Sequence, residues 1–75
     1  MNDDRRKLIN EAKELISRAS DLVEQARDEE QEAYDNLPES LQATERGAEM
    51  DENISTLDSA LSSLEDAYGE LDDGM

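Results

Sequence analysis

The chain has 75 residues and a formal net charge of -15, from 22 Asp and Glu residues against 7 Lys and Arg residues. A chain this short holds one small core, and it has no Phe, Trp or Cys to reinforce that core with large aromatic groups, disulfides or thiolate-bound metal. We therefore expect the chain to self-associate and so enlarge its small core. The charge disfavours direct binding to nucleic acid or to anionic membranes. With no apolar run of membrane-spanning length and no cysteine, we expect a soluble protein of the cytosol.

Apolar residues recur at helical spacing through the first half of the chain, which predicts a helix over residues 3–35. Either Asn2 or Asp3 can cap its start. Three columns of seven-residue spacing run along it: Leu8, Leu15 and Leu22; Ile9, Ile16 and Val23; and Ala12, Ala19, Ala26 and Ala33. Together they form one broad apolar stripe, in which the alanines permit the close approach of an antiparallel helix.

Pro38 interrupts this pattern, because proline lacks a backbone donor and disfavours helical geometry in the residue before it. We therefore expect a turn over residues 36–43, in which Pro38 opens one helical turn through Leu41. Ser40 or Thr44 can cap the helix that follows, and Thr44 is the favoured residue.

Residues 44–72 carry a seam of apolar positions in steps of three and four, which predicts a second helix of coiled-coil type. The seam consists of Gly47, Met50, Ile54, Leu57, Leu61, Leu64, Tyr68 and Leu71. The short connection favours an all-α antiparallel hairpin with Tyr68 near Leu8. The sequence leaves open an alternative in which the two helices extend away from each other at Pro38 and are exchanged between chains.

A single hairpin would leave much of the stripe on the first helix exposed, so we predict a homodimer in which two hairpins form a four-helix bundle. The residues expected in its seam are Leu8, Ile9, Leu15, Ile16, Leu22, Met50, Ile54, Leu57, Leu61, Leu64 and Tyr68.

The absence of His and Cys removes the usual nucleophile–base pairs and zinc ligands, so we predict that the protein is not an enzyme. Its glycines form no phosphate-binding loop. The acids at positions 51–52 and 72–73 do not match the spacing of a calcium loop, and the Glu-x-x-His pattern of di-iron bundles is missing. We expect no metal and no cofactor.

Carboxylates are the remaining candidates for binding a partner. They are Asp28, Glu29, Glu30 and Glu32 near the turn, and Glu45, Glu49, Glu52, Asp66, Glu70 and Asp73 on the outer face of the second helix. One interpretation is a solvated face that keeps the protein soluble. The more specific one is an imitation of a phosphate backbone. A rod of about 50 Å carries roughly one charge per 3.3 Å, and a side-by-side dimer approaches the value of about one per 1.7 Å of duplex DNA.

The segment from Glu29 to Met50 resembles one that recurs in small helical proteins of bacteriophages and prophages. The shared residues are Tyr34, Asn36, Pro38, Leu41, Gln42, Glu45 and Arg46, followed by a leucine-rich acidic helix. The resemblance covers about half of the chain and implies a phage setting, with no functional residues to carry over. In that setting, a small acidic protein is similar in character to phage-encoded inhibitors of host defence, including anti-CRISPR and antirestriction DNA mimics.

Two functions therefore compete. The first is an inhibitor that binds a basic surface of a host nucleic-acid-binding or defence protein through its acidic helices, and this binding should weaken steeply with salt. The second is a structural or assembly module that forms a coiled-coil-like complex through its hydrophobic seam, with little dependence on salt. An acidic solubilising protein without a dedicated partner is a third interpretation.

Overall fold

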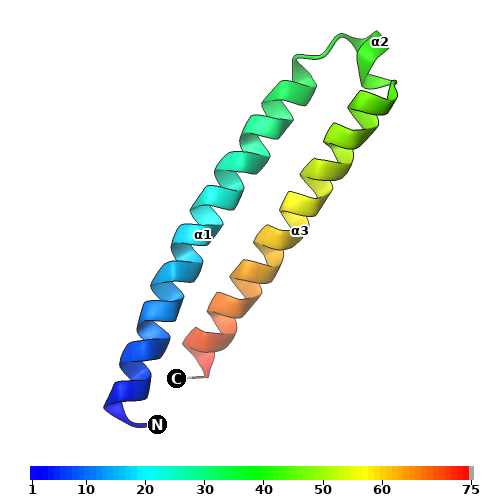
Figure 1. Cartoon of the computed structure of the whole chain (residues 1–75). Helices are drawn as coiled ribbons and strands as arrows, with labels where there is room; N and C mark the ends of the chain where they lie inside the picture. Colours follow the sequence, from blue (N-terminus) through cyan, green and yellow to red (C-terminus); the bar gives the residue numbers. More distant parts are fainter. Residues whose placement is uncertain (75) are drawn as a thin grey trace.

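The structure is a computed structural model that describes residues 1–74, and these residues contain three helices and no β-strand. Helix α1 spans Asp3–Asp35, α2 spans Glu39–Gln42 and α3 spans Glu45–Asp73. The long helices α1 and α3 run antiparallel, with both chain ends at one end of the molecule and α2 at the other (Figure 1). The molecule is a rod with extents of 58 × 15 × 13 Å. The predicted all-α class is confirmed, with a third, single-turn helix between the two long ones.

The ends of α1 follow from local chemistry. At its start, the side-chain oxygen of Asn2 accepts a hydrogen bond of 2.9 Å from the backbone N–H of Arg5, which satisfies one of the free donors of the first turn. Asp3 and Asp4 in that turn interact favourably with the helix dipole. At its end, the backbone N–H of Asn36 still bonds to the carbonyl of Glu32, and Pro38 then stops the helix.

Gln42 closes the turn. Its side-chain amide donates to the backbone carbonyls of Tyr34 and Leu37, each at 3.1 Å, and so satisfies acceptors at the C-terminal end of α1. Thr44 is the N-cap residue of α3, as the sequence predicted. Its hydroxyl does not accept from α3, however, but donates to the carbonyl of Leu41. The side chains of Gln42 and Thr44 both therefore fix the turn.

Gly47 allows α3 to lie directly against the backbone of α2. The residue is buried, and a Cβ atom placed on it would lie 2.6 Å from the carbonyl carbon of Gln42 and 2.7 Å from its Cα. Such distances are far below van der Waals contact, and the obstructing atoms are backbone atoms that cannot rotate away. The first turn of α3 consequently packs on α2.

The core between α1 and α3 is thin. Within residues 1–74, only Ile54, with 8% exposure, and Leu61, with 9%, are buried apolar residues of the core, and both belong to α3. Across from them, the column of Ile9, Ile16 and Val23 is half-buried against α3. The three leucines of the neighbouring column remain exposed, Leu8 by 65%, Leu15 by 57% and Leu22 by 66%. The broad stripe expected on the first helix is therefore divided, with one column used inside the hairpin and one outside it.

Two ion pairs between the helices define their register. Lys13 contacts Asp72 at 2.6 Å and Arg27 contacts Asp58 at 3.2 Å, so the same step of 14 residues separates the partners on each helix. In this register Tyr68 lies beside Lys13, and the expectation that it would lie near Leu8 is wrong. Because Asp72, near the end of α3, pairs with Lys13, the first turns of α1 extend past the end of α3.

Candidate interaction surfaces

The outer face of α3 carries the acidic residues that the sequence singled out. Glu45, Glu49, Glu52, Asp66, Glu70 and Asp73 are all exposed. They form two groups, one at each end of the helix, separated by the hydroxyl side chains of Thr56, Ser59 and Ser63. Within residues 1–74, none of the six carboxylates forms an ion pair with Lys or Arg. We call this set the outer acidic face; it is solvated and its charge is uncompensated.

The acids near the turn behave differently from one another. Asp28 pairs with Arg27 at 2.8 Å, and Glu29 accepts a long hydrogen bond of 3.4 Å from Gln25. Glu30 is half-buried and accepts a hydrogen bond of 3.1 Å from Asn53 on α3. Only the side chain of Glu32, which is exposed, has no hydrogen bond or ion pair in the described part of the chain. The structure therefore does not gather these four acids into one surface with the outer acidic face.

A second acidic column was missed from the sequence. Asp51, Asp58, Glu65 and Asp72 follow one another at seven-residue spacing along the edge of α3 that faces the bases of α1. Asp58 and Asp72 hold Arg27 and Lys13, while Glu65 lies beside Ser20 in a shallow hollow between the helices. The sequence contains a signal for this column, because Lys13 and Arg27 are 14 residues apart, as are Asp58 and Asp72. We call this side of the hairpin the ion-paired edge.

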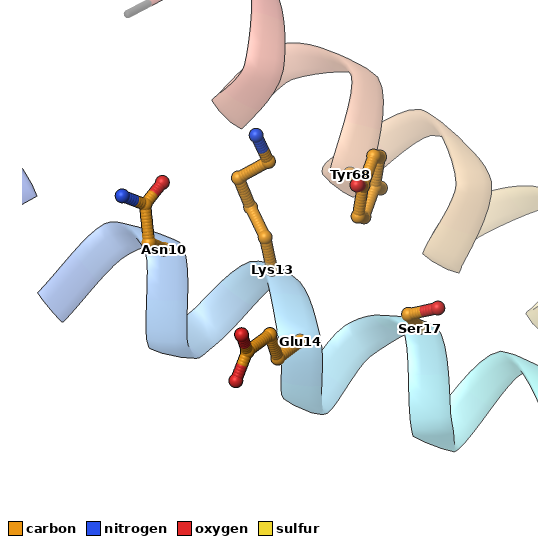
Figure 2. A pocket seen from close by; sticks show the side chains of 5 residues that line it. All are labelled: Asn10, Lys13, Glu14, Ser17 and Tyr68. Carbon is orange, nitrogen blue, oxygen red and sulfur yellow. The ribbon is translucent and has the colours of Figure 1, made fainter. Parts of the chain in front are cut away.

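Lys13 forms the shorter of the two cross-helix ion pairs of this edge. Figure 2 shows its side chain reaching from α1 toward α3, beside the ring of Tyr68 and above Asn10, Glu14 and Ser17. Its ammonium lies 5.3 Å from the ring centroid, within the range of a cation–π interaction. The hydrogen bond to Asp72 raises the pKa of Lys13 above its ordinary 10.5, and partial desolvation opposes this only in part. The contacts of Lys13 with Asp72 and Tyr68 link α1 to α3.

The opposite edge of the hairpin is apolar. Three exposed leucines lie there: Leu8, Leu15 and Leu22. Leucine side chains that stay in contact with water do not stabilise the fold. Most other residues expected in the dimer seam lie between the two helices of one chain: Ile9, Ile16, Met50, Ile54, Leu57, Leu61 and Leu64 are buried or half-buried there, and Tyr68 is 39% exposed. Of the expected seam, the three leucines are therefore the part that a single chain leaves most open.

Among the residues that the structure describes, no three His, Cys, Asp or Glu side chains converge on a point where a metal ion would fit. Neither long helix within residues 1–74 has an apolar stretch long enough to cross a membrane.

No protein family, curated protein or solved structure matches the chain. A functional proposal therefore depends on the outer acidic face, the ion-paired edge and the exposed leucines.

Proposed function

We propose that the protein is a non-enzymatic inhibitor that binds a basic, nucleic-acid-binding surface of another protein through the outer acidic face. The observation that carries this proposal is the separation of charge between the two helices. Six of the seven bases lie on α1, whereas α3 contains ten acids and only Arg46. A cleft lined with bases strongly attracts a rod of opposite charge, since the electric fields of the basic side chains in the cleft add together.

The charge density is comparable with that of DNA only when two hairpins are combined. Fifteen charges over the 58 Å length correspond to about one charge per 3.9 Å for one chain. Two chains side by side would carry about one per 1.9 Å, close to the value of about one per 1.7 Å for the duplex. The proposed inhibitor is accordingly a homodimer, with the two hairpins joined in a four-helix bundle.

The proposed setting is a phage-encoded protein acting in the host cytosol on a defence protein, in the manner of anti-CRISPR or antirestriction DNA mimics. The similarity of the turn segment to phage proteins supports this setting. The shared residues Tyr34 and Gln42 are joined by a hydrogen bond, so they maintain the turn and are not part of the proposed binding surface. Direct binding to nucleic acid or to a membrane is not part of the proposal.

The test is protection of a sensitive phage in bacteria that carry restriction and CRISPR systems. The protein should raise the plating efficiency, and a variant with Glu45→Gln, Glu49→Gln and Glu52→Gln should lose most of this effect. The matched control is Glu11→Gln, Glu14→Gln and Asp21→Asn, which removes the same three charges from exposed positions of α1. Equal protection by both variants would refute a role for the outer acidic face. Circular dichroism establishes that both variants remain helical.

A second candidate function is an assembly module, and the exposure of Leu8, Leu15 and Leu22 favours it. Such a module would bind its partner through apolar contacts, with an affinity that changes little between low and high salt. Leu15→Asp with Leu22→Asp should then abolish binding, whereas loss of the three glutamates should not. Substituting Leu57 or Leu61 would not answer this question, because Leu61 is buried and Leu57 half-buried within the hairpin.

A further inference from the structure

Helix α1 has a second coiled-coil seam, whose leucines the hairpin leaves exposed. Leu8, Ala12, Leu15, Ala19, Leu22 and Ala26 follow one another in steps of four and three residues. At about 100° per residue, this seam lies roughly 100° around the helix from the line that contacts α3. A helix in a four-helix bundle contacts two neighbours at about a right angle to each other. The arrangement of α1 therefore provides for one further neighbour.

Helix α3 has small residues on the same edge of the hairpin. Asn53, Ala60 and Ala67 form a column of seven-residue spacing, and the hydrogen bond of Asn53 to Glu30 shows that this column lies next to α1. The ion pairs of Asp58 and Asp72 lie on the other edge. Large residues on α1 and small residues on α3 thus occur side by side. We call this side the leucine–alanine edge.

We infer that a second copy of the chain covers the leucine–alanine edge, with α1 of each copy packed on α3 of the other. This inference rests on the proposed homodimer and specifies its interface. A two-fold axis parallel to the helices keeps residues at the same height, so the register within the hairpin also applies between the copies. That register brings Leu22 of one copy within one helical turn of Ala60 of the other, and Leu15 within one turn of Ala67. Each leucine then meets a small residue, which permits close helix packing.

Charge selects this arrangement over the one in which α1 packs on α1. With α1 on α3, each α3 lies between two α1 helices, which carry six of the seven bases of each chain. The two α3 helices, with ten acids each, are then diagonal to each other. Packing α1 on α1 would instead bring the two α3 helices into contact. The second copy is also the occupant that the thin core requires, because a chain whose described residues bury only Ile54 and Leu61 as apolar core gains most from further burial.

Disulfide trapping tests the arrangement directly, because the chain has no cysteine of its own. A Leu22→Cys chain and an Ala60→Cys chain of different tag length are mixed and oxidised. A disulfide needs Cβ atoms within about 4.5 Å of each other, so we expect a covalent heterodimer from the mixture and little covalent dimer from either chain alone. Self-linking of Leu22→Cys as efficient as in the mixture would show α1 on α1 and overturn the inference. Absence of any covalent dimer would overturn it as well.

Sedimentation distinguishes failure of this interface from failure of the dimer. Leu15→Glu with Leu22→Glu should weaken self-association about 100-fold or more and give a helical monomer at micromolar concentration. The matched control, Ser55→Glu with Ser62→Glu, adds the same two charges at exposed positions away from this edge and should remain dimeric. A wild-type chain that sediments as an 8.4 kDa monomer refutes the dimer itself. A wild-type dimer that survives in the double leucine variant refutes only the interface.

Discussion

The turn at residues 36–44 and the shaft formed by α1 and α3 are held by different kinds of contact. In the turn, Gln42 satisfies two backbone carbonyls and Gly47 allows backbone to lie on backbone. In the described part of the shaft, Ile54 and Leu61 are the only buried apolar residues, and the ion pairs are at least partly exposed. The turn therefore fixes the direction and register of the helices through short local contacts, whereas the shaft supplies a modest apolar contribution that a second chain would increase.

The largest effect is expected in the shaft. Leu61→Ala removes one of two buried apolar side chains, and it should lower the free energy of unfolding by about 2 to 4 kcal/mol. For a domain of this size that loss is most of the stability, so urea denaturation followed by circular dichroism should show a largely unfolded variant. The control is Leu41→Ala, in which the substituted leucine is 44% exposed and the loss should be much smaller. Similar losses would mean that the shaft has no distinct core.

The turn should be sensitive to a single methyl group. Gly47→Ala places a Cβ against the backbone of Gln42 and should cost about 1 to 3 kcal/mol, despite the higher helix propensity of alanine. The same substitution at Gly69, also in α3, meets no atom within 4 Å and should stabilise by about 0.5 to 1 kcal/mol. Thermal unfolding of the two variants should therefore shift in opposite directions. A shift of the same sign in both would show that α2 does not pack closely on α3.

Gln42→Ala tests the polar contacts of the turn. The carbonyl of Leu37 loses its donor, whereas that of Tyr34 keeps the backbone N–H of Leu37, and the expected cost is about 1 to 2 kcal/mol because the site is partly buried. Gln25 bonds only to the exposed side chain of Glu29 at 3.4 Å, so Gln25→Ala should change the stability by less than about 0.5 kcal/mol. Chemical denaturation of both variants measures the difference, and equal values would contradict a structural role for Gln42.

The smallest effect concerns the ion-paired edge. Ser20 lies midway between Lys13 and Arg27 and faces Glu65, so Ser20→Lys should complete a row of three cross-helix ion pairs. The expected gain is about 0.2 to 1 kcal/mol, and it should diminish as salt screens the pair. Ser20→Met is the uncharged control. A gain in the methionine variant as large as in the lysine variant would attribute the effect to apolar contact alone.

The fold class followed from the sequence because its signals are local. Steps of three and four residues identify each long helix, and Pro38 separates them. The sequence did not predict which face of α1 lies against α3. The leucine column and the column of Ile9, Ile16 and Val23 are equally apolar, and polar side chains beside them decide the choice. Lys13 and Arg27 flank the second column and match Asp72 and Asp58, so pairing across the helices selects it.

The candidate surfaces were predicted less completely than the helices. Exposure of the six acids on the outer face of α3 follows from their distance around the helix from the apolar seam. Glu30 could not be placed in this way, because its inward position depends on a hydrogen bond to Asn53, which is 23 residues away. The role of Gln42 likewise depends on the position of α2, which places its side-chain amide beside the carbonyls of Tyr34 and Leu37. Contacts set by the register between elements leave no periodic signal in a single sequence.

The seven bases cannot balance the 22 acids, which leaves a net charge of -15. Within the described residues, only Lys13 and Arg27 form ion pairs, so repulsion among the remaining carboxylates acts along the whole rod. Dissolved cations shorten the range of that repulsion to about 8 Å at physiological ionic strength. Counterions thus take over the neutralising role that lysines and arginines have in most small domains, and the folded chain should tolerate concentrated salt better than dilute buffer.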